Sequence, residues 1–341
     1  MIGIQHNKPA LILAPMEGVT DAPMRALLAE RGGFNLCVSE FLRISGNVPS
    51  RRALLRHVPE LTKGPNKVEG VTSSGVPVQV QLLGGHGERI AQAAQLATDL
   101  GSPGIDLNFG CPAPTVNRHD GGAALLLYPE RIREIVRAVR QAVPSHLPVS
   151  AKLRLGYESM TDIYTNALMA QEGGASWITI HARTKTQGYR PPAFWEYIAE
   201  TKRRVTIPVV ANGDIWDIDG FRRCREITGC EHFMIGRGVL ANPSLPLQIA
   251  RELGLVASAI VDSATVEDID WSSAQAWQSI FQRFSTHCEA YAHNQYYNLA
   301  RLKQWIGMAA YRRELLWFQS LRKAQSLDGF FAVLASFSAT S

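Results

Sequence analysis

Eight short apolar segments recur between residues 10 and 236, with helical stretches between most of them. Each segment is almost continuously apolar, which is typical of parallel strands covered by helices. We expect strands at 10–16, 34–39, 78–84, 104–110, 149–156, 177–181, 208–213 and 232–236. We expect helices at 21–31, 88–100, 130–142, 161–173, 194–204 and 217–228. Eight strand–helix units predict an α/β fold of the TIM (β/α)8 barrel type. A doubly wound open sheet is the alternative.

The strand–helix alternation stops near residue 255, and the rest of the chain has a different pattern. A polar, acidic stretch, "VDSATVEDID", covers 261–270, and helical patterns follow it. We therefore predict a barrel domain at 1–255, a linker at 256–270 and a small C-terminal all-helical domain at 271–341.

The basic charge of the protein is concentrated in the C-terminal part. The whole chain has 35 Lys and Arg against 30 Asp and Glu, a net charge of +5. Residues 271–325 hold seven Lys and Arg, two acids and eleven aromatic residues, which is also a net +5. Basic residues interleaved with aromatic ones suit a phosphate backbone and unpaired bases. The alternative, which the residues alone favour, is a helical core of aromatic side chains with a solvated basic face.

Several classes of protein have no support in the sequence. Apolar runs fall short of the roughly 20 residues that a membrane span needs, and the N-terminus lacks the pattern of a signal peptide. The five cysteines contain no CxxC pair, which indicates reduced thiols rather than disulfides or a zinc site. We expect a cytoplasmic protein, a monomer, with no metal and no membrane partner.

One cysteine stands apart from the other four. Cys111 lies in "IDLNFGCPAPTVNRHDGGAALL" (105–126), between Gly110 and Pro112, where an apolar run ends. Glycine and proline mark a turn rather than a core. The sequence therefore presents Cys111 at a strand end, where it is a candidate for chemistry. We take Cys37, Cys224, Cys230 and Cys288 as structural.

The predicted strand ends carry polar or glycine-rich groups, and in a TIM barrel these ends form the active site. Lys152 lies in the strand-like run "VSAKLRLG", where a buried charge needs a partner. "ANGDIWD" and "MIGRGVLANP" follow strands seven and eight, where such barrels commonly bind phosphate. A phosphate-bearing cofactor, a lysine, a glutamine from strand three and a presented cysteine together suggest flavin chemistry.

With these motifs in place, the sequence resembles the tRNA-dihydrouridine synthases. The resemblance covers most of the chain and rests on "APMEGVTD", "VQLLG", "DLNFGCP", "GGAALL", "KLRLG", "HARTKTQGY", "ANGDI" and "MIGRG". "LAPMEGV", "CVSEFLR", "ANGDIWD" and "ARLKQWI" are most similar to the bacterial C branch of that family, whose members act on U16 of the tRNA D-loop.

The resemblance implies a mechanism and a set of site residues. Cys111 would protonate C5 of the uracil while reduced FMN, regenerated by NADPH, gives a hydride to C6. The implied FMN-binding residues are Pro15, Met16, Glu17, Gln81, Lys152, His181, Asn212, Gly213, Asp214, Gly236 and Arg237. Asn108 and Arg154 would orient a flipped uracil. The implied further tRNA contacts are Arg43, Tyr189, Arg301 and Lys303.

Other functions stay open from the residues alone. One is a flavin barrel that reduces a small free pyrimidine, as dihydroorotate dehydrogenases do. Another is an aldolase in which Lys152 forms a Schiff base. A third is an RNA-binding barrel without catalysis. The C-terminal basic helices count against the first, and Cys111 with Gln81 has no role in the second.

Overall fold

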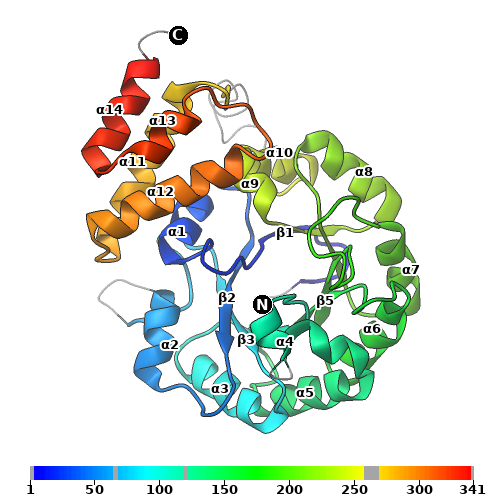
Figure 1. Ribbon diagram of the computed structural model, residues 1–341. Helices are drawn as coiled ribbons and strands as arrows, with labels where there is room; N and C mark the ends of the chain where they lie inside the picture. Colours follow the sequence, from blue (N-terminus) through cyan, green and yellow to red (C-terminus); the bar gives the residue numbers. More distant parts are fainter. Residues whose placement is uncertain (1–3, 64–67, 119–120, 257–268, 339–341) are drawn as a thin grey trace.

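The computed structural model describes residues 4–63, 68–118, 121–256 and 269–338 (Figure 1). Most of the predicted linker, 256–270, lies outside the described residues, so the boundaries of the two predicted domains remain a proposal. No helix in the described part of the chain is both long and apolar enough to cross a membrane.

The sheet is a closed barrel of eight parallel strands in sequence order, with β1 paired to β8. The TIM-barrel prediction is confirmed and the open-sheet alternative is wrong. All eight predicted strands form, at β1 Ala10–Leu13, β2 Leu36–Arg43, β3 Val78–Leu83, β4 Ile105–Asn108, β5 Val149–Arg154, β6 Trp177–His181, β7 Val209–Asn212 and β8 His232–Ile235.

Helices surround the barrel on its outside (Figure 1). The six predicted helices all form, as α1 Ala22–Glu30, α3 Gly87–Asp99, α5 Pro129–Ala142, α6 Asp162–Glu172, α7 Glu196–Arg204 and α8 Ile218–Thr228. The sequence analysis missed the shorter elements α2 Arg51–His57, η1 Pro59–Leu61, α4 Pro114–Asn117, η2 Gly122–Leu127, α9 Arg237–Ala241 and α10 Leu245–Glu252.

Local sequence explains where several of these helices begin and end. The Asp21 carboxylate accepts a hydrogen bond from the backbone of Met24 at the start of α1, and Asp217 does the same for Gly220 in α8. Pro129 occupies the first position of α5, where its missing N–H costs nothing. Gly229 ends α8 with a φ of 59°, which glycine adopts without strain.

The barrel interior is divided between apolar and polar side chains. Alternate residues of each strand point inward. One separate hydrophobic cluster fills part of this interior, with Ile12, Ala14, Leu36, Val38, Trp177, Val210 and Met234. The inward positions of β3, β4 and β5 are instead polar, at Gln79, Gln81, Asp106, Asn108, Ser150 and Lys152.

Four helices form the C-terminal part, which lies beside α1 and α9 (Figure 1). They are α11 Ala274–Ala290, α12 Gln295–Ala309, α13 Phe318–Lys323 and α14 Leu327–Ser338. Their core is aromatic: Trp277, Phe281 and Trp305 are fully buried and contact one another edge-on or tilted. The alternative of an aromatic core is therefore correct for these residues, although Tyr296 and Tyr311 are exposed.

Hydrogen bonds join these helices to the end of the barrel. The indole Nε1 of Trp305 donates to the carbonyl of Leu240 at 3.0 Å, and Nε of Arg313 donates to that of Ala241 at 2.8 Å. Both carbonyls belong to the last turn of α9, which would otherwise leave them unpaired. Arg301 in α12 donates to the carboxylate of Asp21 at 2.8 Å.

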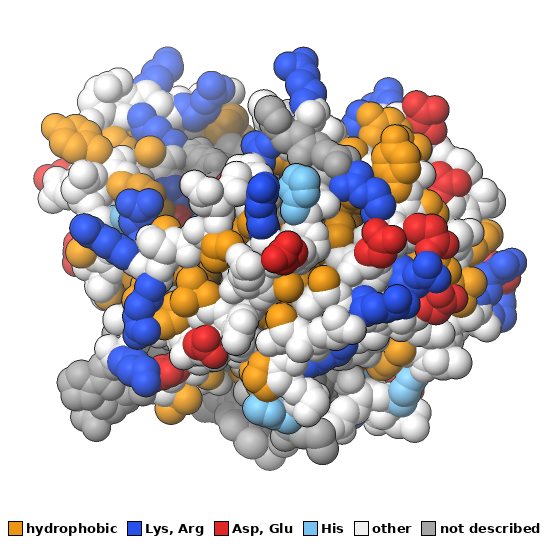
Figure 2. Space-filling view, turned by 90° about the horizontal axis from the view of Figure 1, so that it is seen from below, with side chains coloured by type: hydrophobic (Ala, Val, Ile, Leu, Met, Phe, Trp, Pro, Cys, Tyr) orange, Lys and Arg blue, Asp and Glu red, His pale blue; other side chains and the backbone are white. Residues whose placement is uncertain are grey.

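The side of the barrel that carries α3 and α5 shows both signs of charge among hydrophobic side chains (Figure 2). Some of these charges form ion pairs with one another. Arg133 in α5, for example, forms ion pairs with Glu130 and with Glu172 in α6. Exposed pairs of this kind contribute little to stability. The functional features lie at the barrel mouth instead.

Candidate active site

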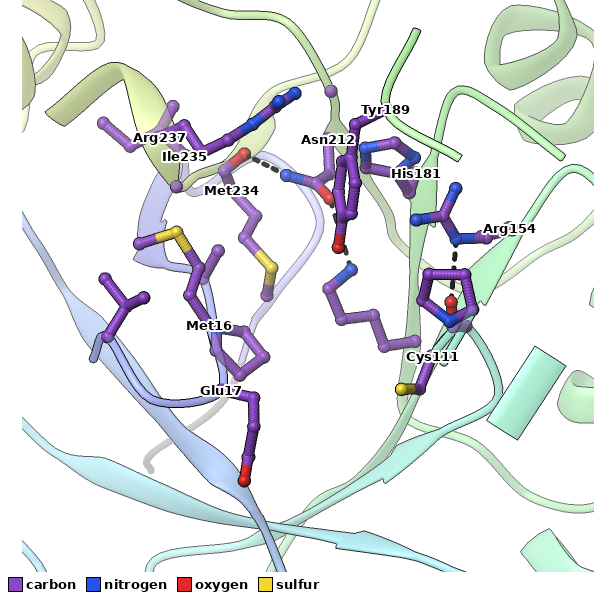
Figure 3. A pocket seen from close by; sticks show the side chains of 18 of the residues that line it. Met16, Glu17, Cys111, Arg154, His181, Tyr189, Asn212, Met234, Ile235 and Arg237 are labelled. Atoms are coloured by element: carbon purple, nitrogen blue, oxygen red, sulfur yellow. Dashed lines mark hydrogen bonds between the residues drawn. The ribbon is translucent and has the colours of Figure 1, made fainter. Parts of the chain in front are cut away.

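A cavity of about 570 Å³ opens at the carboxyl ends of the strands. Its walls come from the segments that follow β1, β4, β5, β6, β7 and β8, and Met308 of α12 closes one side. Ligand sites of enzymes are commonly concave and of this size. Barrel strand ends and α12 therefore build one site together, and Figure 3 shows side chains from the strand ends around this cavity.

Most of the residues singled out from the sequence meet in this cavity. The predicted site residues that line it are Pro15, Met16, Glu17, Asn108, Cys111, Lys152, Arg154, His181, Tyr189, Asn212, Gly213, Asp214, Gly236 and Arg237. Residues far apart in the chain thus share one space, as the closure of the barrel requires.

The Cys111 loop is held by the side chain of Asn108. The amide oxygen of Asn108 accepts hydrogen bonds from the backbone N–H groups of Gly110 and Cys111, both at 2.9 Å. Gly122 packs behind the loop with a φ of +61°, and a Cβ there would lie 2.9 Å from the Cys111 carbonyl oxygen. The glycines of "GGAALL" therefore allow the loop to approach, and the Cys111 sulfur points into the cavity (Figure 3).

Burial raises the pKa of the Cys111 thiol, and this effect exceeds the opposing influence of a backbone hydrogen bond and of Arg154. The thiol therefore keeps its proton at neutral pH. A thiol that is protonated and faces a cavity is suited to give a proton rather than to attack as a thiolate.

A chain of hydrogen bonds inside the barrel supports Asn108 from below. We call Asp106, Gln81, Asn108 and Ser150 the interior network. Nε2 of Gln81 donates to Asp106 at 2.7 Å, and Nδ2 of Asn108 donates to Oε1 of Gln81 at 2.9 Å. Ser150 donates to the other carboxylate oxygen of Asp106. Because an ionised carboxylate only accepts, Asp106 fixes which end of each amide faces which way.

Lys152 lies beside this network with its ammonium group in the cavity wall. It donates to Oδ1 of Asn212 at 3.2 Å, and Nδ2 of Asn212 donates to the carbonyl of Met234 at 2.8 Å. Burial lowers the pKa of Lys152, with Arg154 lowering it further and Asp106 opposing both. A desolvated cation at this position is suited to stabilise negative charge that develops on a ligand.

The opposite end of the cavity is built to receive an anion. His181 is buried, and its Nδ1 atom has no hydrogen-bond partner among the described residues. Burial, followed by nearby cations, holds the pKa of His181 well below its usual value. Arg183 and Arg237 share the single carboxylate of Asp214. A Cβ at Gly236 would lie 3.1 Å from the sulfur of Met16 and 3.3 Å from the Cβ of Ala14, so a side chain at this position would be crowded.

Four predicted site residues lie elsewhere. Gln81 is buried beneath the cavity in the interior network. Arg43 is partly exposed at the end of β2 and donates to the carbonyl of Thr115. Arg301 is buried at the junction of α12 with the barrel, on Asp21 and on the carbonyls of Gly18 and Val19.

The fourth of these residues, Lys303, donates to the carbonyl of Ala324 within the C-terminal helices.

The cavity also contains residues that were not predicted from the sequence, among them Trp216, Met234 and Met308. Trp216 stands in the quoted motif "ANGDIWD", so an aromatic residue three positions after the strand-end Gly213 was the available signal. Met308 comes from α12, and no local pattern marks which helical residue meets the barrel. In the described residues, no group of three His, Cys, Asp or Glu side chains could hold a metal ion.

Comparison with known proteins gives a consistent result. Residues 12–326 match the dihydrouridine synthase (Dus) family. The tRNA-dihydrouridine(16) synthase of Neisseria meningitidis serogroup B is 42% identical over 99% of this chain and 98% of its own length. That of Shewanella oneidensis is 51% identical over 69% and 73%. The structure of histamine dehydrogenase from Rhizobium sp. 4-9 has a TM-score of 0.55 at 14% identity, covering 82% of this chain and 49% of that one, which supports the fold alone.

Proposed function

The chain belongs to the dihydrouridine synthase family, and from that premise we propose that it reduces uridine 16 of the tRNA D-loop to 5,6-dihydrouridine. The observation that carries the proposal is the Cys111 thiol, held protonated by burial and aimed into the cavity by Asn108. The similar relatives that carry the name tRNA-dihydrouridine(16) synthase support position 16 as the target.

FMN is the cofactor that we propose for this site, with NADPH as its reductant. Two features fit a phosphate group: the orphaned Nδ1 of His181, and Arg183 with Arg237, which share the one carboxylate of Asp214. Lys152, Pro15, Met16 and Glu17 would contact the flavin ring, and Asn212 would help to hold the phosphate-bearing chain. When bound and reduced, FMN supplies the hydride that C6 of uracil receives.

The residues of this chain would supply the remaining chemistry. Cys111 holds the proton that C5 receives, and the interior network fixes the backbone that carries the thiol. Lys152, as a desolvated cation, stabilises negative charge in the cavity. Arg154 donates to the carbonyls of Gly110 and Gly188, so it joins the Cys111 loop to the segment of Tyr189.

Taking uracil out of its stack is required before C5 and C6 can reach these groups. We propose Arg43 and Tyr189 as tRNA contacts at the edge of the cavity. Arg301 and Lys303 bond within the protein, so we propose that they act by positioning α12. All five cysteines are free, consistent with action in the cytoplasm. We also propose a monomer that needs no metal.

The first test combines a spectrum with an assay. The purified protein should carry stoichiometric FMN, seen in its visible absorption and identified after denaturation. With NADPH and an unmodified tRNA transcript, it should form dihydrouridine at position 16, located by mass spectrometry of nuclease fragments. Turnover of a free pyrimidine in place of tRNA would favour the small-molecule alternative. A colourless protein that FMN cannot reconstitute would overturn the mechanism and return Lys152 to a Schiff-base test.

A further inference from the structure

Cations and aromatic rings alternate along a path that leaves the cavity toward α12. The guanidinium of Arg154 lies 5.1 Å from the ring centre of Tyr189, and that of Arg237 lies 4.7 Å from the same ring. Arg237 also lies 4.9 Å from the ring of Trp216, and Arg312 covers Trp216 at 4.2 Å. Arg312 is 5.8 Å from the ring of Tyr311. We call these six residues the rim ladder.

The inner and outer halves of the rim ladder differ in their surroundings. Arg154, Tyr189, Arg237 and Trp216 line the cavity, whereas Arg312 and Tyr311 lie beyond it, just after the end of α12. Tyr311 is 68% exposed and Arg312 is also exposed. The two ends of the rim ladder thus connect the reaction site with the surface of the C-terminal helices.

Two features of the rim ladder, one in each half, are unexplained by the fold. Arg312 has no carboxylate within ion-pair distance in the part of the chain that the structure describes, whereas Arg183 and Arg237 both pair with Asp214. The indole N–H of Trp216 is buried and has no hydrogen-bond partner among those same residues. An unpaired cation and an unpaired donor beside exposed aromatic faces leave room for a ligand that offers phosphate oxygens and flat rings.

Resting on the proposed function, we propose that the outer rim ladder binds an unpaired nucleotide next to the target uridine. The base stacks on Tyr311, and Arg312 binds a phosphate of the same strand. Base-on-aromatic stacking is the common way in which proteins hold unpaired nucleotides, and it tolerates any base. The continuity of the rim ladder with the cavity places this nucleotide beside the extruded uridine.

The test is equilibrium binding of an unmodified tRNA transcript to the FMN-loaded protein, which requires no turnover. The double variant Tyr311→Ala, Arg312→Ala should bind tRNA about 5- to 150-fold more weakly, which is the range that stacking of one base provides. FMN content and NADPH oxidation in the absence of tRNA should be unchanged. The matched control is the double variant Tyr296→Ala, Arg322→Ala. It removes an exposed tyrosine of α12 and an exposed arginine of α13, both in the C-terminal part of the protein.

The control should bind tRNA within twofold of the unchanged protein. An affinity of the rim-ladder variant that stays within twofold would overturn the proposal. Equal weakening by both double variants would also overturn it, because it would show a general effect of charge. Binding is measured independently of turnover. A failure to form dihydrouridine would therefore count against the proposed function, and the binding data would still test the rim ladder.

Single substitutions separate the two halves of the assignment. Arg312→Ala should reduce the slope of log affinity against log salt by about one, as the loss of one phosphate contact requires. Tyr311→Ala should lower affinity without changing that slope. Arg312→Lys should keep most of the slope, since lysine also neutralises a phosphate. An unchanged slope in Arg312→Ala would remove the phosphate contact from the proposal.

Discussion

The interior network and the rim ladder are both rich in polar groups, yet they are satisfied in opposite ways. Within the interior network, Asp106, Gln81 and Asn108 bond to one another and to the Cys111 loop. In the rim ladder, the guanidinium of Arg312 has no carboxylate partner and the indole N–H of Trp216 has no hydrogen-bond acceptor among the described residues. Buried polar groups are normally paired. The difference indicates that one region is complete without a ligand and that the other is shaped for one.

The contrast indicates that the interior network fixes the geometry of the reacting groups and that the rim ladder binds the substrate. A network that is fully paired holds one geometry, which a proton donor needs. A surface of aromatic rings beside an arginine without a carboxylate partner accepts ligands that differ in detail. Variants in the first region should therefore alter the rate, and variants in the second should alter the affinity for RNA.

Removal of the Cys111 thiol, which the interior network positions, should have the largest effect on the reaction rate. Cys111→Ala should lower the single-turnover rate of dihydrouridine formation by about 10²- to 10⁴-fold, the usual contribution of a general acid. FMN content and tRNA affinity should not change. Cys230→Ala is the control, because that cysteine is buried away from the cavity. A rate within threefold of normal for Cys111→Ala would show that another group gives the proton.

The second-largest effect should come from the junction between α12 and the barrel, which supports the outer end of the rim ladder. Arg301→Ala should reduce the free energy of unfolding by about 3 kcal/mol, because it leaves the Asp21 carboxylate without its cation and the carbonyls of Gly18 and Val19 without this donor. Thermal denaturation followed by circular dichroism measures the change. Arg322→Ala, at an exposed position, should alter stability by less than about 0.5 kcal/mol. Equal stability of the two variants would contradict the packing role of Arg301.

A milder change tests the orientation that Asp106 imposes. Asp106→Asn keeps the shape of the side chain but adds a donor, so the amides of Gln81 and Asn108 no longer have one fixed direction. The rate should fall by about tenfold, the value of one hydrogen bond, with tRNA affinity unchanged. Asp219→Asn, on the exposed face of α8, is the control. A fall in tRNA affinity with an unchanged rate of dihydrouridine formation would contradict the assignment of the interior network to the reaction rate.

The smallest expected effect concerns Glu40, whose pKa burial raises to about 7. An unfolded glutamate titrates near pH 4.3. The neutral form is therefore favoured in the fold, and its contribution is present at low pH and lost as pH rises through about 7. Glu40→Gln should become more stable relative to the unchanged protein between pH 5 and pH 8, by roughly 1 kcal/mol after allowance for solvent. Melting temperatures at the two pH values measure it; a constant difference would contradict the shift.

The barrel could be predicted from the sequence because each strand is a compact apolar run and each helix has its own start and stop signals. Cys111 and Lys152 could be found because each breaks a local pattern, a thiol at a turn and a charge within a strand. The family resemblance implied that Arg301 contacts tRNA, and nothing in its local sequence shows that it is buried. Its burial depends on where α12 meets Asp21, 280 residues away in the chain.

Other features were missed for similar reasons. The sequence assigned no specific role to residues 330–341, yet their described part, 330–338, belongs to α14 and buries Phe330 and Leu334 against the other C-terminal helices. The partners of Gln81 could not be read from β3, because they lie on the adjacent strand β4. Long-range pairing, rather than local propensity, decides these cases.

The hydrogen bonds from Trp305 and Arg313 to the last turn of α9 have a consequence for the thermodynamics of the whole chain. One continuous hydrophobic cluster also includes residues of the barrel and of α11, α12 and α14. The C-terminal helices therefore complete the barrel end as well as extend it. Unfolding of either part exposes groups that the other satisfies, so heat or denaturant should melt both in one cooperative transition.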